Sequence, residues 1–454
     1  MKKPPPGLII AAPASGSGKT VLTLGLLRHF QRGGLAVAPF KTGPDYIDAA
    51  YLGAAAGRDC VNLDGWAMRP ATLAGLIAGL EADSDLIIGE GVMGLFDGAS
   101  VGGGSDGASD GGTSDGAGST ADLAALTGWP VILVIDARGM AASAAVVARG
   151  FADHRDDITL AGIIFNRVGG GRHAETLRDA CEAAGCPPVL GCVPRHASLS
   201  LAERHLGLVQ ATEQEGLARY IENAADLVAE HIDTAALKGL VVSGAAAGGD
   251  PAPPLPPLGQ HMAVARDEAF AFAYPWLLEA WRRAGSELSF FSPLADEAPD
   301  ERADAVYLPG GYPELHAGRL AANGAFLAGL MRAAGRQAVV YGECGGYMVL
   351  GQALIDGEGA GHAMAGLLPH TTAFAEPRLH LGYRRLTLTA EGPLGAAGAG
   401  FRGHEFHYAT QTAGDGAQPL FQAADAAGRH LSPMGAVVGP VMGSFAHLVD
   451  RCDD

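Results

Sequence analysis

The sequence has no long apolar run and little positive charge. No stretch approaches the roughly 18 apolar residues of a membrane-spanning helix, and Pro and Gly interrupt the apolar segment near the amino terminus. Lys and Arg number 31 against 49 Asp and Glu, which gives a formal net charge of −18. Because nucleic acids and anionic membrane surfaces attract surplus cations, this balance argues against both partners and favours small-molecule substrates.

Cysteine is also scarce, with six residues in 454 at positions 60, 181, 186, 192, 344 and 452. Such scattered cysteines are typical of reduced thiols in a cytoplasmic protein and not of a disulfide framework. Cys181, Cys186 and Cys192 lie close in sequence, but their spacing is not that of a zinc-binding CxxC pair. We therefore expect a cytoplasmic protein with no metal site at this cluster.

The length predicts more than one domain. The segment 244–259, "GAAAGGDPAPPLPPLG", has the composition of an interdomain linker, so we expect a first domain over 1–243 and a second over 260–454. Residues 97–118 form a Gly/Ser/Asp-rich stretch that is expected to be a mobile loop. It lacks the large apolar residue of a calcium-binding Gly/Asp repeat. The oligomeric state is left open, with a homodimer as one expectation.

Short apolar runs alternate with Ala- and Leu-rich helical segments along the first domain. The expected strands include "GLIIAAP" near the amino terminus and the segments 35–41, 85–91, 130–137, 161–168 and 188–194. Continuous apolar strands separated by helices predict an α/β fold with a parallel sheet covered on both faces. After the linker the same alternation begins again, so a second α/β domain is expected. In such sheets the chemistry lies at the carboxyl ends of the strands.

The segment "AAPASGSGKT" (11–20) lies between the first expected strand and a helix. A Gly-rich turn at this place presents backbone N–H groups and a helix amino terminus to phosphate, which predicts a nucleotide-binding loop. The binding residues we expect are Ser15, Gly16, Ser17, Gly18, Lys19 and Thr20. Pro13 departs from the usual pattern, which has a glycine there.

Further charged residues follow the next strands. Lys41, Asp45 and Asp48 come from "KTGPDYID", whereas Glu90 and Asp97 come from "EGVMGLFDG". Hard oxygen ligands at the same sheet edge as a phosphate-binding lysine suit Mg²⁺ with a nucleoside triphosphate. We therefore predict Thr20, Asp45 and Glu90 as magnesium ligands. Taken singly, each acid is more often an ordinary solvated loop residue.

The segment "YGECGGYMVLG" places Cys344 between an expected strand and a helix. Flanking glycines permit a sharp turn that exposes the thiol, and the helix amino terminus favours the thiolate, so Cys344 is predicted to be a nucleophile. The predicted oxyanion donors are the backbone N–H groups of Gly310, Gly311 and Gly345. His447 is the predicted base. The competing histidines stand at 362, 370, 380, 404 and 407.

Together the motifs resemble those of a known family. They are "KTGPDYID", "EGVMGLFDG", "NRVGGGRH", "RHLGLVQATE", "LPGGYPE", "GECGGYM" and "GHEFHY". The first half resembles dethiobiotin-synthetase-like ATPases, and the second resembles class I glutamine amidotransferases of the triad type. The combination resembles the cobyrinic acid a,c-diamide synthase family of cobalamin biosynthesis, including its hydrogenobyrinic acid counterpart. The resemblance covers nearly the whole chain.

This resemblance implies an ATP- and glutamine-dependent ligase that amidates the a and c acetate carboxylates of the corrin ring through acyl phosphates. It assigns Cys344 as the glutaminase nucleophile, His447 as its base and Lys41 to the ATP phosphates. Asp48 and Asp97 are placed near the acyl phosphate or the ring carboxylate. The class I pattern has a glutamate two residues after the histidine, whereas this sequence has Val449. The group that orients His447 is therefore not identified, and the register makes Asp450 a doubtful choice.

Three alternatives are weighed. Glutamine-hydrolysing cobyric acid synthase shares both domains and amidates the b, d, e and g side chains, but that family lacks "GPDYID". A regulatory ATPase of the deviant P-loop type carries an extra lysine early in the loop, where this chain has Ala14 and Ser15. A corrinoid-binding scaffold with an inactive glutaminase half would not require Cys344 and His447.

Overall fold

The computed structural model describes residues 6–99, 117–196, 203–204, 207–243, 253–375, 378–413 and 416–452. Most of the Gly/Ser/Asp-rich stretch 97–118 and the first part of the 244–259 linker lie outside these residues. The described chain forms two compact units. The first contains the described residues up to 243 except 67–72, and the second contains 67–72 together with the described residues from 253 onward.

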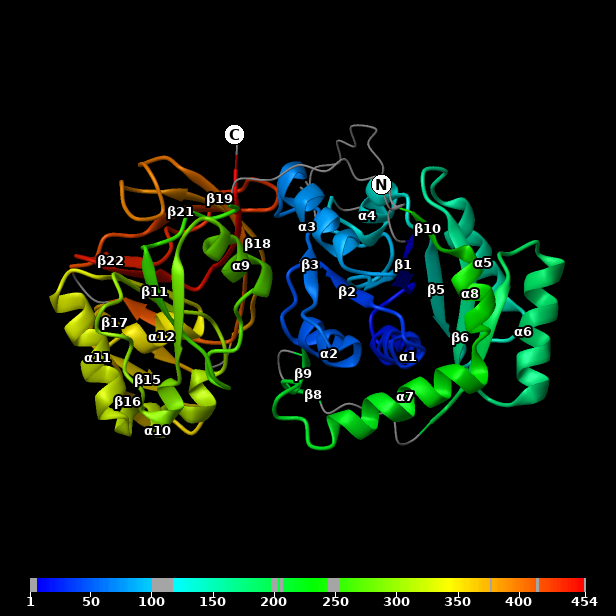
Figure 1. Cartoon of the computed structure of the whole chain (residues 1–454), viewed down its shortest axis with the longest axis horizontal. Coiled ribbons are helices and arrows are strands. Elements are labelled where there is room, and N and C mark those ends of the chain that lie inside the picture. Colours follow the sequence, from blue (N-terminus) through cyan, green and yellow to red (C-terminus); the bar gives the residue numbers. More distant parts are fainter. Residues whose placement is uncertain are drawn as a thin grey trace. The chain divides into compact units, whose positions relative to one another are not determined.

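The first unit is built on a parallel sheet with the strand order β3-β2-β4-β1-β5-β6-β7 (Figure 1). A short strand, β10, pairs antiparallel with β1. The strands are β1 (Pro6–Ala11), β2 (Val37–Thr42), β3 (Val61–Leu63), β4 (Leu86–Glu90), β5 (Val131–Asp136), β6 (Leu160–Val168), β7 (Val189–Pro194) and β10 (Val242–Ser243). A two-residue pair, β8 (Glu203–Arg204) and β9 (Gly207–Leu208), stands outside the sheet.

Helices connect the strands of this unit. They are α1 (Lys19–Arg32), α2 (Ile47–Ala56), α3 (Pro70–Ala82), α4 (Thr120–Thr127), α5 (Ser143–Asp153), α6 (Gly171–Ala183), α7 (Leu217–His231) and α8 (Thr234–Leu240). Ser119 caps α4, because its hydroxyl accepts a hydrogen bond from Asp122 N. Helices α1 and α7 lie side by side and are joined at the surface by the ion pair of Arg32 with Asp226 at 2.7 Å.

Two aromatic rings lie against glycines of this sheet. Gly89 on β4 stands beside Phe40 on β2 in the strand register, and a Cβ atom at position 89 would overlap the Phe40 ring. At Gly7 on β1, a Cβ atom would lie 2.6 Å from Cε2 of Trp129. The rings of Phe40 and Trp129 are 5.2 Å apart. Close packing between these rings and the bare backbone therefore holds β1, β2 and β4 in place.

The second unit has a six-stranded sheet with the order β12-β11-β13-β14-β23-β22, of which the first five strands are parallel. They are β11 (His261–Ala265), β12 (Glu287–Phe291), β13 (Ala305–Leu308), β14 (Val339–Glu343), β22 (Ala436–Val438) and β23 (Val441–Ser444). Its helices are α9 (Pro275–Arg283), α10 (Ala317–Ala322), α11 (Gly324–Gly335) and α12 (Gly345–Leu350), with 3₁₀ turns η1 (Pro293–Ala295) and η2 (Pro313–His316).

Two four-stranded sheets complete the second unit. One has the order β16-β15-β17-β20, with β15 (Ala353–Ile355), β16 (Gly361–Ala363), β17 (His370–Ala373) and β20 (Thr410–Ala413). The other is antiparallel with the order β21-β18-β19-β24. Its strands are β18 (His380–Leu388), β19 (Gly400–His407), β21 (Phe421–Asp425) and β24 (His447–Arg451).

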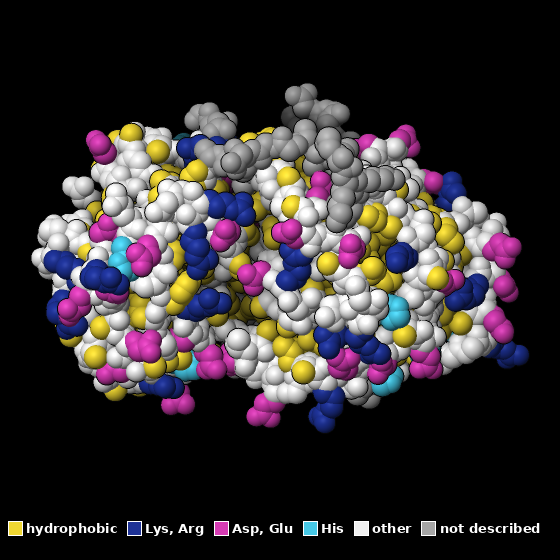
Figure 2. All heavy atoms as spheres, viewed as in Figure 1, with side chains coloured by type: hydrophobic (Ala, Val, Ile, Leu, Met, Phe, Trp, Pro, Cys, Tyr) yellow, Lys and Arg dark blue, Asp and Glu magenta, His cyan; other side chains and the backbone are white. Residues whose placement is uncertain are grey.

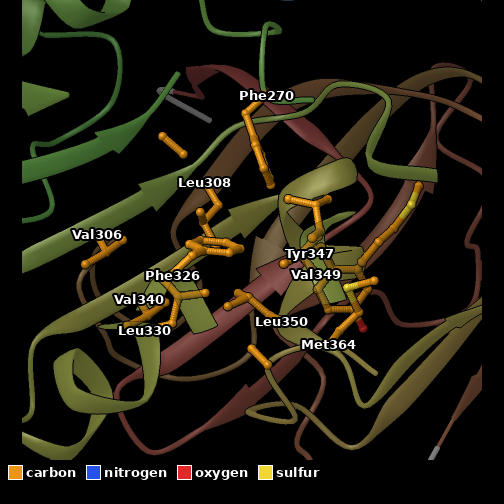
Figure 3. Packing of buried hydrophobic residues seen from close by; sticks show 14 of the residues in the cluster. Phe270, Val306, Leu308, Phe326, Leu330, Val340, Tyr347, Val349, Leu350 and Met364 are labelled. Carbon is orange, nitrogen blue, oxygen red and sulfur yellow. The ribbon is translucent and has the colours of Figure 1, made fainter. Parts of the chain in front are cut away.

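The core of the second unit packs under the turn that follows β14. Figure 3 shows Leu308 of β13 and Val340 of β14 beside Phe326 of α11, with Tyr347 of α12 in the same cluster. Cys344 belongs to this cluster too and is only 3% exposed. The nucleophile predicted from the sequence thus stands on a rigid apolar base, as positioned catalytic groups require.

The α/β fold class predicted from the sequence is confirmed, and every strand expected in the first domain is present. Strand β3 is missing from that prediction because "VNL" is too short to show a periodic pattern. Glu90 is therefore the last residue of the fourth strand along the chain, and not of the third, and Asp97 follows it. No helix within the described residues combines the length and hydropathy needed to cross a bilayer. The face shown in Figure 2 carries acidic and basic side chains interspersed.

We expect Gly89→Ala to lower the free energy of unfolding of the first unit by about 1–3 kcal/mol, because the added methyl group has no space beside Phe40. The midpoint of urea unfolding measures this effect. Gly79→Ala in α3 is the matched control, since a Cβ atom there meets nothing within 4 Å. It should leave stability unchanged or raise it by up to about 1 kcal/mol. Equal losses from the two substitutions would contradict the packing argument.

Candidate active sites

The loop between β1 and α1 has the backbone of a phosphate-binding turn. Gly16 and Gly18 adopt φ angles of +75° and +92°, which disfavour any residue with a Cβ atom. Asn166, at the end of β6, donates from Nδ2 to the Ser17 carbonyl at 2.9 Å. The left-handed positions are thus supplied by glycines 16 and 18, and Pro13 is compatible with the turn.

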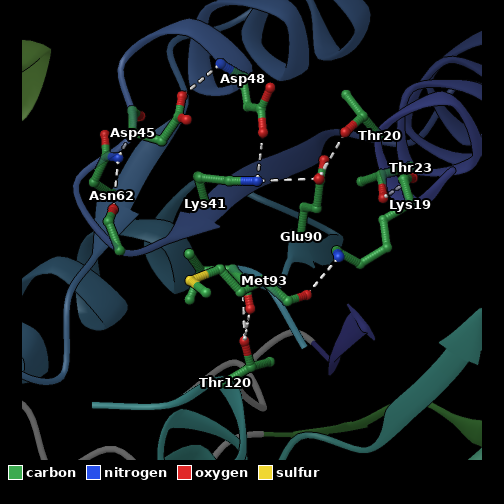
Figure 4. Close-up of polar contacts among 12 residues, drawn as sticks. Lys19, Thr20, Thr23, Lys41, Asp45, Asp48, Asn62, Glu90, Met93 and Thr120 are labelled. Atoms are coloured by element: carbon green, nitrogen blue, oxygen red, sulfur yellow. Dashed lines mark hydrogen bonds and ion pairs between the residues drawn. The ribbon is translucent and has the colours of Figure 1, made fainter. Parts of the chain in front are cut away.

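Two side chains of this loop contact the segment after β4 (Figure 4). Lys19 Nζ donates to the Met93 carbonyl at 2.6 Å, and Thr20 Oγ1 donates to Glu90 Oε1 at 2.8 Å. Burial lowers the pKa of Lys19, and the positive charge of Lys41 acts in the same direction. The loop, the lysine and the carboxylate therefore meet at the carboxyl edge of the sheet, as the sequence predicts for neighbouring strands.

Lys41 lies at the centre of a buried charge cluster (Figure 4). It stands beside Glu90 in the register of β2 and β4, and its Nζ lies 3.0 Å from Glu90 Oε1 and 2.7 Å from Asp48 Oδ2. Burial alone would lower the pKa of Lys41, but the neighbouring carboxylates of Asp48, Glu90 and Asp45 outweigh burial and raise it. Lys41 therefore remains a cation inside the protein.

Asp45 and Asp48 are held at the start of α2. Asp45 Oδ1 accepts from Asp48 N at 2.7 Å, and Asn62 Nδ2 donates to the Asp45 carbonyl at 2.8 Å. Burial and the nearby charge of Asp48 raise the pKa of Asp45 to about 7. Asp97 Oδ2 accepts from Gly94 N at 2.8 Å and thereby shapes its own loop. The sequence did not single out Asn62, although it fixes the loop that carries Asp45.

The donors at this edge are compatible with a divalent cation. Burial raises the pKa of Glu90, and its Oε2 has no hydrogen-bond partner among the described residues although it is shielded from solvent. A buried carboxylate oxygen without a partner suits a cation ligand. No group of three or more His, Cys, Asp and Glu side chains in the described chain could hold a metal ion by itself. Magnesium commonly takes only one or two carboxylates and completes its shell with phosphate oxygens and water.

Cys344 stands in a strained turn in the second unit. Its backbone has φ +46° and ψ −103°, and its N–H donates to the Ser444 carbonyl of β23 at 2.8 Å. A left-handed conformation at a non-glycine residue is uncommon and is typical of functional sites. Burial raises the pKa of the Cys344 thiol, and the charge of Glu314 adds to the effect. The thiol therefore needs a base before it can act as a nucleophile.

The predicted oxyanion donors and the predicted base lie at this turn. A Cβ atom at Gly345 would lie 3.1 Å from Gly311 N, so these two backbones touch. A Cβ atom at Gly310 would overlap Cε1 of His447 and would lie 3.2 Å from its Nε2. The imidazole thus packs directly on the glycine turn, and only a residue without a side chain fits beneath it.

His447 is enclosed by other ionisable groups. It is 1% exposed, and its ring stacks on that of His404 at 4.8 Å with an interplanar angle of 9°. Burial lowers the pKa of His447 well below its ordinary value, and the neighbouring imidazoles of His404 and His407 act in the same direction. A buried carboxylate lies near the ring, with Glu343 Oε2 4.0 Å from Nδ1.

Glu343 is a candidate that the motifs of the sequence do not reveal. The residue immediately precedes the nucleophile, and the triad pattern directs attention to the residues after the histidine. Asp450, which lies there, is engaged elsewhere: its Oδ2 accepts from Arg69 N at 2.8 Å and its Oδ1 from Arg69 Nε at 3.0 Å. Among the other candidate histidines, His362 pairs with Asp356 at 2.7 Å. His370 stacks on Tyr347 at 4.1 Å.

Both units match known families. The model of the CobQ/CobB/MinD/ParA nucleotide binding domain matches residues 8–209, and that of the CobB/CobQ-like glutamine amidotransferase domain matches residues 261–451. The hydrogenobyrinate a,c-diamide synthase of Brucella anthropi is 52% identical over 453 residues, which cover 99% of each chain. That of Rhodobacter capsulatus is 53% identical over 450 residues, covering 99% of this chain and 100% of its own.

A third relative of the same name, from Rhizobium meliloti, is 51% identical over 448 residues, covering 98% of this chain and 99% of its own. These matches extend through both units and both groups of candidate residues. Identity at this level over the full length leaves the fold and the domain order unchanged. The chain belongs to the family of hydrogenobyrinate a,c-diamide synthases.

Proposed function

We propose that this protein uses ATP and glutamine to convert the a and c acetate carboxylates of hydrogenobyrinic acid into amides. The observation that carries the proposal is the pairing of two sites in one chain. One is a glycine-lined cysteine turn with an imidazole packed on it, and the other is a nucleotide loop joined to a buried Lys41–Glu90 pair. Full-length relatives that carry this activity in their names support the choice of substrate.

The second unit is proposed to release ammonia from glutamine. Cys344 Sγ loses its proton to His447 and forms a bond with the carboxamide carbon, and the N–H groups of Gly310, Gly311 and Gly345 stabilise the resulting oxyanion. The C–N bond then breaks as His447 returns the proton to the departing nitrogen. Water hydrolyses the thioester, which yields glutamate and restores the thiol.

The first unit is proposed to activate the acid. A ring carboxylate attacks the terminal phosphorus of ATP and expels ADP, because hydroxide is too poor a leaving group for direct amide formation. Ammonia then attacks the acyl carbon, phosphate departs, and the extra proton passes to solvent. Residues Ser15 to Thr20 would hold the phosphates with Lys41, while Asp48 and Asp97 would act near the acyl phosphate or the ring carboxylate.

Magnesium would accompany the nucleotide. Thr20, Asp45 and Glu90 are the residues that would hold it, and when bound it neutralises charge on the phosphate oxygens. The raised pKa values of Asp45 and Glu90 mean that a cation at this edge would also favour their ionised forms.

The proposed setting is the cytoplasm, where thiols such as that of Cys344 remain reduced. Cobyric acid synthase is the second candidate because it shares both kinds of domain. The names of the full-length relatives favour a,c-amidation over it. A regulatory ATPase activity would not account for the strained turn at Cys344.

Purified protein with ATP, Mg²⁺ and glutamine should convert two carboxylates of hydrogenobyrinic acid into amides, counted by mass spectrometry of the product. Only two acetate side chains match the proposed specificity, so the reaction should stop there. The same assay with cobyrinic acid shows whether the ring metal matters. Four conversions would favour the cobyric acid synthase activity, and no conversion would refute the proposal.

Cys344→Ala should reduce glutamine-dependent amidation by at least about a thousandfold, because no other group can form the thioester. Amidation with an added ammonium salt should continue at the wild-type rate. Cys452→Ala, a half-buried cysteine of the same unit, is the matched control and should retain both activities. Loss of both activities in Cys344→Ala would contradict the assignment of glutamine hydrolysis to the second unit and of amidation to the first.

Glu90→Gln should lower amidation by about a hundredfold or more with either nitrogen source, since it removes a predicted cation ligand while Lys41 keeps Asp48 as a partner. Release of glutamate from glutamine should persist. Asp85→Asn, at the opposite end of β4, is the control because an amide oxygen can still accept from Ala36 N. Unchanged ADP release in Glu90→Gln would remove this residue from the ATP site.

A further inference from the structure

The base of the proposed glutaminase lacks an acid at the expected place in the sequence. Val449 occupies that place, two residues after His447, and is 1% exposed within the core. An imidazole that takes a proton from a thiol becomes a cation, and a buried cation without a nearby anion is strongly disfavoured. Some other group in the second unit must therefore compensate this charge.

Glu343 is placed to do so. Its Oε2 lies 4.0 Å from His447 Nδ1, and its Oε1 accepts from Leu448 N at 3.2 Å. The carboxylate thus contacts both His447 and the backbone of the residue that follows it. Pairing of β14 with β23, which sets Glu343 opposite Ser444, brings the end of β14 to the start of β24. Catalytic hydrogen bonds are often long before substrate binds and tighten in the complex, so a separation of 4.0 Å is compatible with this role.

Two tyrosines hold the carboxylate in this orientation. Tyr307 donates to Glu343 Oε2 at 2.8 Å, and Tyr341 donates to Oε1 at 2.9 Å. Burial and the adjacent carboxylate raise the pKa of both phenols, so they remain protonated donors. Burial raises the pKa of Glu343 to about 7, while these donors and Leu448 N favour its ionised form. The carboxylate is therefore held in place by three donors that favour its ionised form.

The other charged groups near this site have different partners. His404 covers one face of the His447 ring and lies 3.1 Å from the Tyr274 hydroxyl. Glu405 forms ion pairs with Arg384 and with His407 at 3.3 Å. The negative charge of Glu314 raises the pKa of the Cys344 thiol. Asp450 is bound by Arg69.

We propose that Glu343 is the positioning residue for His447, an acid supplied by the residue immediately before the nucleophile. This inference rests on the proposed glutaminase activity. Glu343 receives the Nδ1 proton of the imidazole in a hydrogen bond, which leaves Nε2 free to accept the proton of Cys344. The proton stays on the imidazolium until the nitrogen departs, and Glu343 compensates that charge without itself forming a bond to substrate.

Steady-state hydrolysis of glutamine by the full chain tests the proposal. Glu343→Gln keeps the shape but removes the charge, and it should lower kcat by about 10²–10⁴ with little change in KM for glutamine. Amidation from an ammonium salt should stay within about twofold of wild type, since that step does not use His447. Asp450→Asn is the matched control, a buried carboxylate on the same strand as His447, and should retain kcat within about threefold.

Comparing Glu343→Asp with Glu343→Gln distinguishes the effect of the carboxylate charge from the effect of side-chain packing. If the charge orients His447, the shorter carboxylate should retain more activity than the isosteric amide. If Glu343 only fills space, the order should be reversed, because Asp leaves a cavity and Gln does not. Melting temperatures identify any variant that fails to fold. If one does, the kcat of the folded variant is compared with that of wild type, and a role of the charge predicts near-wild-type kcat in Glu343→Asp or a large loss in Glu343→Gln.

Alkylation of Cys344 by iodoacetamide gives a readout independent of turnover. Loss of the anion beside His447 should move the midpoint of the pH profile of alkylation to higher pH in Glu343→Gln and leave it unchanged in Asp450→Asn. Wild-type glutaminase kcat in Glu343→Gln would overturn the assignment, whatever the kcat of Asp450→Asn. If wild-type protein released no glutamate from glutamine, the proposed function would fail instead.

Discussion

A charge that is removed from water must be compensated by its neighbours, and this constraint governs both candidate sites. In the first unit Lys41 is buried, and it remains a cation because Glu90 and Asp48 lie within 3.0 Å of its ammonium group. In the second unit Glu343 is buried, and three donors satisfy its carboxylate. Such groups are costly for folding. Their presence at the ends of parallel strands is best explained by chemistry that needs preorganised charge.

The register of strand pairing places the compensating groups beside these buried charges. Lys41 and Glu90 are neighbours because β2 and β4 pair in parallel with these two residues side by side, although 49 positions separate them in sequence. Glu343 reaches His447 because β14 pairs with β23, which leads directly into the turn before β24. A shift of one residue in either pairing would turn the side chain to the opposite face of its sheet. The packing of Phe40 on Gly89 helps to fix the first of these registers.

The sequence predicts the fold class, most strands and the elements that carry both sites, because apolar runs and Gly-rich turns are local signals. Strand β3 escapes detection since three residues show no periodicity. The roles of Asn62 and Glu343 escape for another reason, because each depends on a contact with a separate element: Asn62 on β3 holds the loop after β2, and Glu343 on β14 lies near the start of β24. Nothing in the local sequence distinguishes Glu343 from an ordinary buried acid. The grouping of predicted residues at strand ends could be foreseen, but which acid faces His447 could not.

The position of Glu343 shows why chain order is a weak guide to the roles of catalytic groups. Residues that act together are recognised by their geometry, and the order in which they occur along the chain can differ between proteins. At this site three elements converge, namely the end of β14, the turn after β13 and the start of β24. An acid on any of them could face Nδ1 of His447. On β24 the expected place holds Val449 and Asp450 is bound by Arg69, and the turn carries a glycine pair. The carboxylate beside His447 therefore comes from β14, one residue before the thiol. The strained backbone at Cys344 then marks the residue at which the chain leaves β14 and enters α12.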